Sequence, residues 1–384
     1  MLTTVAALTA LVWLYLVFGH GRFWLCSEND RSVPERPLSP WPSVTAVIPA
    51  RDEAETIAAA IASLMAQAYP GNLRVILVDD QSSDGTRDMA RAAAERAGAA
   101  DRLTVVGGRE LATGWTGKLW AQKQGISQAI DRDLPDYLLL TDADITYSPD
   151  ALKSLVIRAE QYGYILTSLM AKLHCKSLAE RALVPAFIFF FQMLFPFPWV
   201  NRPDRAIAAA AGGCMLVRPD ALAAAGGVEA IRGALIDDCA LAAVLKPHGP
   251  IWLGLTERAE SIRAYDTFAQ IRRMVARSAY AQLDYSPLYL AGTVAGMVLT
   301  YLVGPTLALF AHGWPQLLGL LAWALMALAF QPTLRFYRRS PVWGLALPLI
   351  ALVYVAFTVE SAYQHARGRG GLWKGRAQAQ TARR

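Results

Sequence analysis

The chain has 384 residues, of which 54% are hydrophobic and only 18% are charged, whereas about 25% of the residues of an average soluble domain are charged. This composition excludes a disordered or fibrous protein, predicts two or three structural units, and indicates that part of the chain lies in a membrane. The formal net charge is +6, but residues 361–384 alone carry six Lys and Arg and no acid. The rest of the chain is therefore not basic overall, and we expect no nucleic-acid partner.

The first 21 residues contain no Asp, Glu, Lys or Arg, and about 20 apolar residues are enough for a helix to cross a bilayer. We therefore predict a transmembrane anchor over residues 1–21. A cleavable signal peptide is the alternative, but no positive residue precedes the apolar run and no small-x-small cleavage site follows it. Four prolines in residues 22–42 indicate an extended linker.

Two stretches near the C-terminus also lack formal charge. Residues 287–334 are too long for one span and fit two spans joined at residues 312–315, and residues 340–359 fit a third. We predict about three transmembrane helices within residues 286–363, followed by a basic tail over residues 364–384. A buried helical core is the alternative, but it would leave two successive helices with no polar face.

Four predicted spans conflict with the distribution of charge. If the soluble part lies between the first and second spans, four crossings place Arg335 and Arg339 on the side of the soluble part but the basic tail on the opposite side. The positive-inside rule prefers both groups on the cytosolic side. Either one C-terminal segment is re-entrant, or the tail is an exception that the rule permits.

Residues 182–201 form another uncharged stretch of different character. Pro185, Pro196 and Pro198 interrupt it, and Gln192 lies at its middle. Its aromatic side chains are typical of the lipid–water boundary. We predict that this segment lies in the interface, with a full span as the alternative.

Short apolar runs alternate with Ala-rich helical stretches between residues 43 and 285, which is typical of an α/β fold. Each expected strand is apolar on both faces, as in a buried parallel sheet. The expected strands are residues 44–48, 73–78, 103–106 and 137–140, and the expected helices are residues 53–68, 86–97 and 118–129.

Acidic residues directly follow three of these strands. Ligands of parallel α/β sheets bind beyond the carboxyl ends of the strands, and like charges gathered there require a cation or hydrogen-bond donors. Asp142 and Asp144 can share one hard divalent ion, and such an ion can hold a diphosphate. The acidic residues are Asp52 and Glu53 after the first strand, Asp79 and Asp80 after the second, and Asp142 and Asp144 after the fourth.

Three segments carry a resemblance to a known family. Val-Ile-Pro-Ala-Arg-Asp-Glu, Val-Asp-Asp-Gln-Ser-Ser-Asp-Gly-Thr and Thr-Asp-Ala-Asp, in this order and spacing, resemble the family 2 glycosyltransferases over about residues 43–285. The resemblance implies an A-type nucleotide-sugar transferase fold with a Rossmann-like mixed sheet, a nucleotide-sugar donor, and Mg or Mn held by Asp142 and Asp144. It also implies donor contacts by Pro49, Arg51, Glu53, Asp79, Asp80, Lys118 and Asp142. For Lys118, a solvent-exposed lysine at a helix start is the alternative.

Transfer of a sugar to a hydroxyl with inversion needs a carboxylate that takes the acceptor proton. The segment Ile-Asp-Asp-Cys-Ala-Leu at residues 236–241 resembles the Glu-Asp motif of the family, with Asp in the first position. The resemblance implies that Asp238 is the base and Asp237 its neighbour. An acidic pair that begins a helix is compatible with either role.

Gln270 and Arg273 match the Gln-x-x-Arg-Trp motif of membrane-bound members of the family, but Met274 replaces the Trp. The resemblance implies that Gln270 and Arg273 lie on the diphosphate and acceptor side of the site. In processive polysaccharide synthases the Trp stacks against the acceptor sugar, so its replacement argues against polymer synthesis. An interfacial basic face is the alternative for Arg272 and Arg277.

One N-terminal span, a core with Gln-x-x-Arg and three C-terminal spans resemble the ceramide glucosyltransferase relatives and, more closely, the bacterial hopene-associated glycosyltransferases. The resemblance implies a multi-pass protein of the bacterial inner membrane with a cytosolic catalytic domain, and four cysteines without zinc or redox spacing fit that reduced compartment. We therefore expect transfer of one sugar to a hydroxyl of a membrane lipid, with a hopanoid as a candidate. A polyprenyl-phosphate sugar synthase and a non-catalytic membrane scaffold are the alternatives.

Overall fold

The computed structural model describes residues 1–32, 38–368, 372–373 and 376–377. These residues form two compact units, each assembled from separate chain segments. The other residues of the predicted linker and basic tail lie outside the described part of the chain. The sheet unit comprises Glu28–Leu173, Val200–Arg263 and Leu372–Arg384, and the helical unit comprises Met1–Ser27, His174–Trp199 and Ala264–Gly371.

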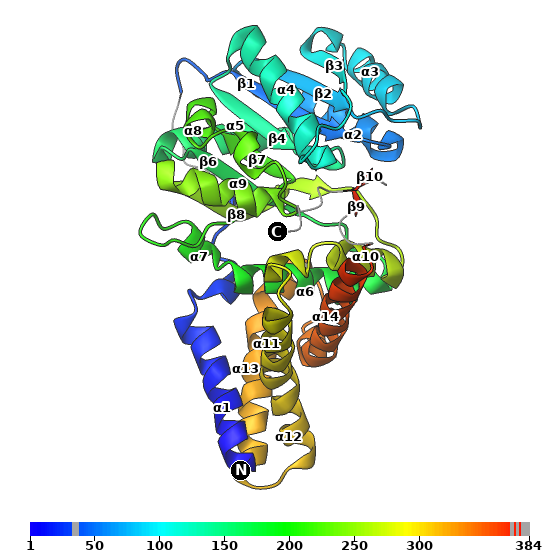
Figure 1. The fold of residues 1–384 in the computed structure, drawn as a ribbon. Helices are drawn as coiled ribbons and strands as arrows, with labels where there is room; N and C mark the ends of the chain where they lie inside the picture. The colour runs from blue at the N-terminus through cyan, green and yellow to red at the C-terminus, as the bar shows by residue number, and fades with distance from the viewer. Residues whose placement is uncertain (33–37, 369–371, 374–375, 378–384) are drawn as a thin grey trace. The chain divides into compact units, whose positions relative to one another are not determined.

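The sheet unit is built on an eight-stranded mixed sheet with the strand order β3-β2-β1-β4-β7-β6-β8-β5 (Figure 1). The pairs formed among the first four strands are parallel, whereas β7 is antiparallel to both of its neighbours and β5 is antiparallel to β8. All four strands expected from the sequence are present. The strands are β1 (Val44–Ala50), β2 (Leu73–Asp79), β3 (Leu103–Gly107), β4 (Tyr137–Thr141), β5 (Ile145–Tyr147), β6 (Leu166–Lys172), β7 (Cys214–Val217) and β8 (Ile251–Ser261).

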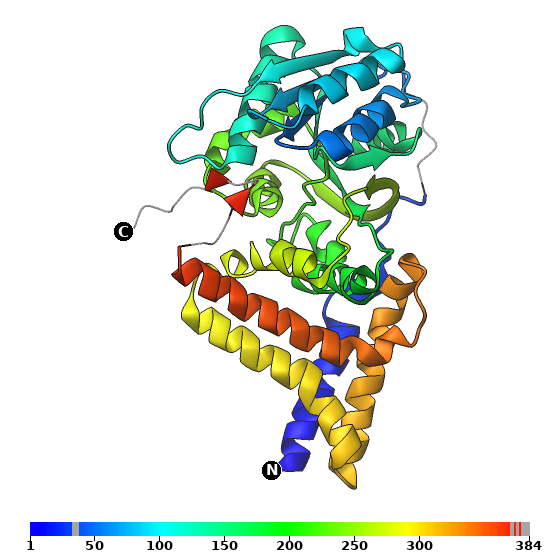
Figure 2. The ribbon, with the colours of Figure 1, turned by 90° about the vertical axis from the view of Figure 1, so that its right-hand side faces the viewer.

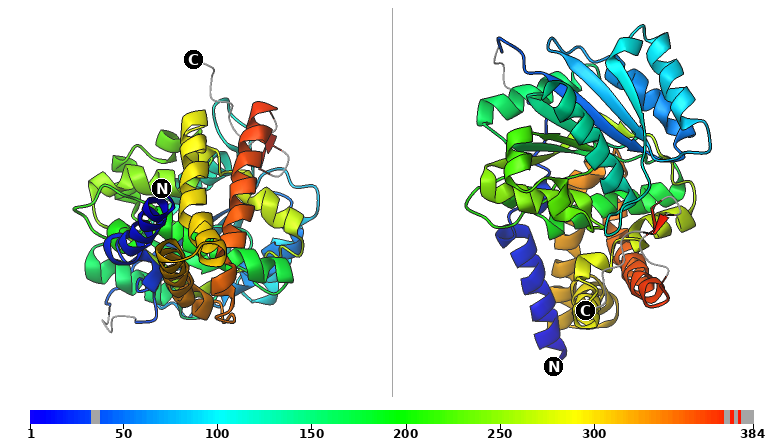
Figure 3. Two further views of the ribbon diagram at one scale, coloured as in Figure 1. Left: turned by 90° about the horizontal axis from the view of Figure 1, so that it is seen from below. Right: turned by 45° about the horizontal axis from the view of Figure 1, so that its top comes forward.

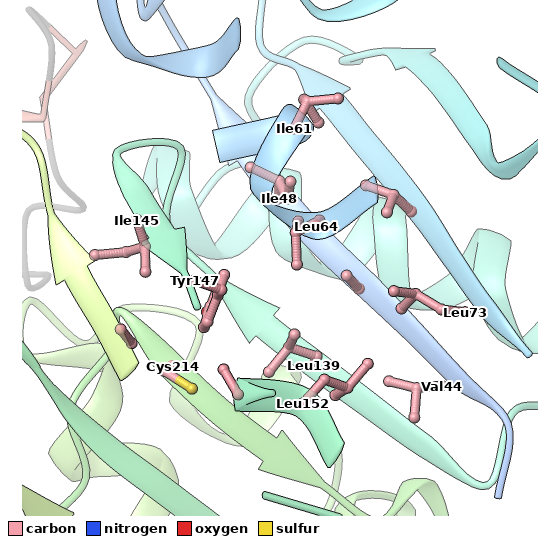
Figure 4. Packing of buried hydrophobic residues seen from close by; sticks show 14 of the residues in the cluster. Val44, Ile48, Ile61, Leu64, Leu73, Leu139, Ile145, Tyr147, Leu152 and Cys214 are labelled. Carbon is pink, nitrogen blue, oxygen red and sulfur yellow. The ribbon is translucent and has the colours of Figure 1, made fainter. Parts of the chain in front are cut away.

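Helices in the connections of the sheet unit cover the sheet and bury its apolar side chains. Figure 4 shows Ile48 of β1 and Leu139 of β4 in one buried cluster with Ile61, Leu64 and Leu152 of the covering helices. Burial of such side chains from water is the main favourable contribution to folding. The helices are α2 (Ala54–Met65), α3 (Thr86–Arg96), α4 (Gly117–Asp133), α5 (Ala151–Tyr162), α8 (Pro219–Ala224) and α9 (Asp237–Leu245).

The packing of α4 on the sheet depends on a glycine. A Cβ at Gly125 would lie 2.5 Å from Cγ1 of Val47 in β1 and 3.0 Å from Cγ2 of Val78 in β2. Only a residue without a side chain permits this approach of helix to sheet. The close packing holds α4, which carries Lys118 in its first turn, against the two strands whose ends carry acidic residues.

Among its described residues, the helical unit contains five helical segments that are long and apolar enough to cross a membrane. Four of them coincide with the four predicted spans, and the fifth is the segment for which an interfacial position was predicted. Figures 1 and 2 show these helices. The elements are α1 (Leu2–Leu14), α6 (Leu178–Leu194), α7 (Phe197–Val200), α10 (Phe268–Ala276), α11 (Pro287–Met297), α12 (Gly304–Phe310), α13 (Trp314–Phe336) and α14 (Trp343–Ala366).

Helix α6 runs crosswise to α1 and α13 in Figure 1. Phe189 and Phe190 are buried within the helical unit, where the ring of Phe189 lies 5.2 Å from that of Phe330 in α13. Phe190 lies 4.9 Å from Tyr354 of α14 in the same way. The segment therefore forms part of the core of the helical unit, and its predicted position at the lipid–water boundary stays a prediction.

Candidate active site

The loops after β1 and β2 are fastened to each other at one edge of the sheet. The backbone N–H of Glu53 donates to Oγ1 of Thr86 at 2.8 Å, and the N–H of Ser83 donates to a carboxylate oxygen of Asp52 at 2.8 Å. Asp84 accepts from the N–H of Ala54 at 2.9 Å. Most of the hydroxyl and acidic residues in these two motifs thus hold the loops in shape. The loops lie beyond the carboxyl ends of β1 and β2, where ligands of parallel α/β sheets bind.

The acidic residues that end β2 are buried and paired within the sheet unit. Asp79 accepts from Arg87 at 2.9 Å. Arg51 donates to the backbone oxygen of Asp80 at 2.6 Å, and its guanidinium lies 3.7 Å from the Asp80 carboxylate. Pro49 lies within β1 and is in register with Val78 of β2. The structure therefore brings the predicted nucleoside-binding residues to one edge of the sheet.

Lys118 connects two of the predicted motifs. Its ammonium lies 2.9 Å from Oδ1 of Asp142 and 3.1 Å from Oδ2 of Asp237. The hydroxyl of Thr116 caps the N-terminus of α4 by accepting from the N–H of Leu119, which fixes the first turn. Only 16% of the Lys118 side chain is exposed, so the alternative of a solvent-exposed lysine is wrong. Burial would lower the pKa of Lys118, but Asp142 and Asp237 outweigh it and raise that pKa, so the ammonium stays charged.

Asp144 is paired with Arg263, a residue outside the motifs of the sequence. Nε of Arg263 lies 2.9 Å from Oδ2 of Asp144, and Nη2 of the same guanidinium lies 2.6 Å from Oε2 of Glu53. Ser261 also donates to Asp144, at 3.1 Å. Arg263 follows the end of β8, and this position depends on the pairing of Ile145 in β5 with Ser261. No local motif marks Arg263, because its partners lie more than a hundred residues earlier in the chain.

Asp237 and Asp238 are the first two residues of α9, so this acidic pair does begin a helix. The two carboxylate oxygens of Asp238 accept from the backbone N–H groups of Gly212, at 2.9 Å, and Cys239, at 2.8 Å. Burial, followed by the negative charge of Asp237, raises the pKa of Asp238 to about 6. A carboxylate with this pKa is ionised at neutral pH yet binds a proton more readily than an ordinary aspartate.

The donor set fits a divalent cation at Asp142 and Asp144. Burial and the neighbouring Asp144 raise the pKa of Asp142 despite the attraction of Lys118, which indicates negative charge that a cation would stabilise. Among the described residues no group of three His, Cys, Asp or Glu side chains forms a metal cage. Mg is commonly bound by one or two carboxylates together with substrate phosphates, and the two aspartates match that pattern.

Gln270 and Arg273 lie on α10 in the helical unit. The side chain of Gln270 accepts from the N–H of Thr267 at 2.9 Å, and the Thr267 hydroxyl accepts from the N–H of Gln270, which makes a capping box. Arg273 is exposed. Gln270 therefore has a structural role at the start of α10, and the expected place of both residues near the diphosphate stays a prediction.

Residues 45–225 match the family model described as Glycosyl transferase family 2. A similar solved structure is a mannosyltransferase from Pyrobaculum calidifontis in complex with GDP-Man and Mn2+, with a TM-score of 0.55 and 17% identity over 95% of this chain and 99% of that one. Residues 45–225 thus resemble a family 2 glycosyltransferase domain, and the predicted A-type fold is confirmed.

One curated relative covers a shorter stretch. It is an N-acetylglucosaminyltransferase from Mesorhizobium japonicum, 30% identical over 122 residues, which are 32% of this chain and 26% of the relative. The chain therefore spans about a quarter of the length of that relative. The resemblance to hopene-associated and ceramide glucosyltransferases stays a prediction.

Proposed function

We propose that this protein is an inverting glycosyltransferase that moves one sugar from a nucleotide-sugar donor to a hydroxyl of a membrane lipid. The observation that carries the proposal is the ion-paired cluster of Lys118, Asp142 and Asp237 beside Asp238. Lys118 links Asp142, which with Asp144 is suited to bind a cation, to Asp237. The neighbouring Asp238 is suited to be the base. The family 2 domain supports transfer of a sugar as the reaction.

On the donor side, Asp142 and Asp144 would hold Mg or Mn. The cation would neutralise the diphosphate that leaves with the nucleoside. Lys118 pairs with Asp142 and supplies a second positive charge beside the diphosphate, whereas Arg263 pairs with Asp144 and would give up part of this contact when the cation binds. The fastened loops after β1 and β2, with Arg51 and Asp80, form the wall against which the nucleoside would lie.

On the acceptor side, Asp238 is the proposed base. Its backbone donors hold the carboxylate in one orientation, and its pKa of about 6 leaves it ionised at neutral pH. It would take the proton of the acceptor hydroxyl as the oxygen attacks the anomeric carbon, while the bond to the diphosphate breaks on the opposite face. Asp237 is proposed as the neighbour of the base rather than the base itself, because its carboxylate is paired with the ammonium of Lys118.

The five apolar helical segments support an acceptor that stays in a membrane. We propose a bacterial inner-membrane location with the sheet unit in the cytosol, and a hopanoid as a candidate acceptor.

The test uses membranes that contain the full-length protein, a panel of nucleotide sugars, Mg or Mn, and a lipid extract. Wild-type membranes are expected to form a glycolipid that Asp238→Asn membranes do not form. Asp101→Asn changes an exposed carboxylate away from the cluster and is expected to behave as the wild type. Equal product from wild type and Asp238→Asn would exclude the proposed reaction.

Two further outcomes separate the alternatives. A product that mild acid cleaves would indicate a polyprenyl-phosphate acceptor, whose anionic oxygen needs less help from a base. Absence of thermal stabilisation by every nucleoside diphosphate with Mg or Mn would favour a non-catalytic scaffold.

A further inference from the structure

The two ends of α13 define two opposite ends of the helical unit. Its first residue, Trp314, follows the turn that ends α12. Its last turns lie beside chain segments that lead to the sheet unit: Thr333 is 3.6 Å from the Cys26 sulfur, and Phe330 packs on Phe189 of α6. We call the end of the unit near Phe336 the junction end, and the end near Trp314 the distal end.

The second half of α14 lies at the junction end. The hydroxyl of Tyr354 donates to the backbone oxygen of Leu183 in α6 at 2.8 Å. The ring of Phe357 lies 5.2 Å from that of Phe268, at the start of α10. One turn further, Glu360 pairs with Arg272 of α10 at 3.1 Å.

The last residues of α14 also lie at the junction end. The ring of His365 stacks on Tyr285 at 4.3 Å, and the hydroxyl of Ser361 accepts from the N–H of Tyr280 at 3.0 Å. Tyr280 and Tyr285 lie between α10 and the start of α11. None of these partners comes from the distal turn.

The first residues of α14 contact the middle of α13, well short of the junction end. Gly344 abuts Ala327 and Gln331, and the indole N–H of Trp323 donates to the backbone oxygen of Leu345 at 3.2 Å. Ala327 precedes the end of α13 by nine residues, which is about 14 Å along a helix. The chain thus folds back along α13 before α14 begins.

A helix of 24 residues is about 36 Å long. If α14 crossed the unit, its last turns would reach the level of Trp314. Figure 2 instead shows α14 and α11 sloping across the unit while α13 runs lengthwise. The view from below in the left panel of Figure 3 shows α14 and α11 extended in the plane and α12 nearly end-on.

We propose that α14 is a re-entrant helix that enters the bilayer from the junction side and returns to that side, so that it contacts the lipids of one leaflet. The exposed face of α14 is suited to lipid, because it carries Leu345, Leu349, Leu352 and Val359. The chain then crosses three times, through α1, through α11 with α12, and through α13. The proposal does not depend on sugar transfer.

This arrangement removes the conflict in the distribution of charge. Arg335, Arg338 and Arg339 lie at the junction end of α13, and Arg367 follows α14 on the same side. The basic residues on both sides of α14 then share the cytosolic face, as the positive-inside rule prefers. An anionic leaflet surface would attract them further.

The test labels single cysteines in the full-length chain, after the four native cysteines have been changed to alanine. The sites are His312→Cys in the distal turn, Ser340→Cys before α14 and Ala366→Cys at its end, all exposed. Glu110→Cys marks the side of the sheet unit. A membrane-impermeant maleimide is applied to intact cells and to permeabilised cells.

We expect Ser340→Cys, Ala366→Cys and Glu110→Cys to react only after permeabilisation, and His312→Cys to react in intact cells. Labelling of Ser340→Cys and Ala366→Cys from opposite sides would overturn the proposal. Size-exclusion profiles of the variants show that labelling reports on folded protein. The assay needs no catalysis, so an inactive protein would not affect the result.

Discussion

Nζ of Lys118 and Oδ1 of Asp142 lie 2.9 Å apart in a site where only 16% of the lysine side chain is exposed. The first carboxylate of the Asp-Ala-Asp segment is therefore charge-paired by the protein itself before any ligand binds. The same ammonium lies 3.1 Å from Asp237, so a residue proposed for the donor side and one proposed for the acceptor side share one cation.

Lys118→Met is expected to lower the thermal midpoint of the protein, because it leaves Asp142 and Asp237 without their cation. The loss should be about 2 kcal/mol, below the range for a fully buried pair because some exposure remains. Lys118→Arg keeps the charge and should lose less. The measurement is thermal unfolding in detergent, and an unchanged midpoint for Lys118→Met would contradict the role of this ion pair.

Asp238→Asn is expected to lower kcat by about 10²–10⁴-fold, because an amide cannot take the acceptor proton. The Kd for the nucleoside diphosphate should change little. Asp237→Asn should weaken binding of metal and nucleotide more than Asp238→Asn, because Asp237 contacts Lys118. Comparison of turnover with nucleotide binding separates the two roles. The reverse pattern would make Asp237 the base.

The pH dependence of kcat/KM should follow the pKa of Asp238, which burial and Asp237 raise to about 6. The ionised form is the active base, so activity should be full above pH 7 and fall about tenfold per unit well below pH 6. An unperturbed aspartate would hold activity down to about pH 4. Nucleotide binding measured over the same range checks that the protein stays folded, and constant activity down to pH 5 would refute the assignment.

Arg263→Gln is expected to tighten Mn binding in the absence of nucleotide by about tenfold, because it removes a positive charge that competes with the cation at Asp144. Arg263→Lys keeps that charge and should bind Mn as the wild type does. Titration followed by the paramagnetic resonance of free Mn measures this without catalysis. Equal affinity in Arg263→Gln and wild type would place the metal away from Asp144.

Thr86→Val should destabilise the sheet unit by about 1–3 kcal/mol, because the buried N–H of Glu53 loses its acceptor. Ser83→Ala is the matched control, since Ser83 lies in the same loop but is exposed, and it should change stability by less than about 0.5 kcal/mol. Chemical denaturation of the two variants gives the comparison. Equal loss in both would show that the loops are fastened differently.

Sequence patterns predicted the elements whose signal is local. The strands that end at Asp79 and Thr141 contain uninterrupted apolar runs, residues 75–78 and 137–140, followed by polar residues, so both the strands and the loop positions could be derived. The local sequence around Lys118 is also compatible with an exposed position, because its partners, Asp142 and Asp237, come from two later motifs. The pairing of Arg263 with Asp144 needs the register of β5 on β8, which no short-range pattern encodes.

The length of an apolar run also predicts only part of the structure. Residues 340–359 predicted a helix, and α14 is present there, but length alone does not give the direction of a helix relative to its neighbours. That direction depends on Tyr354, Phe357 and Glu360 and the segments they contact. The charge distribution was the one sequence feature that pointed to an exception.

The order of the strands bears on how the protein is made. In the sheet, β7 lies between β4 and β6, yet it follows α6 in the chain, as β8 does. The ribosome therefore releases an apolar helix before the strand that joins the two halves of the sheet exists. Asp238 and Arg263 emerge later still. A nascent chain thus contains the complete α6 while the edge of the sheet that carries the proposed site is still incomplete.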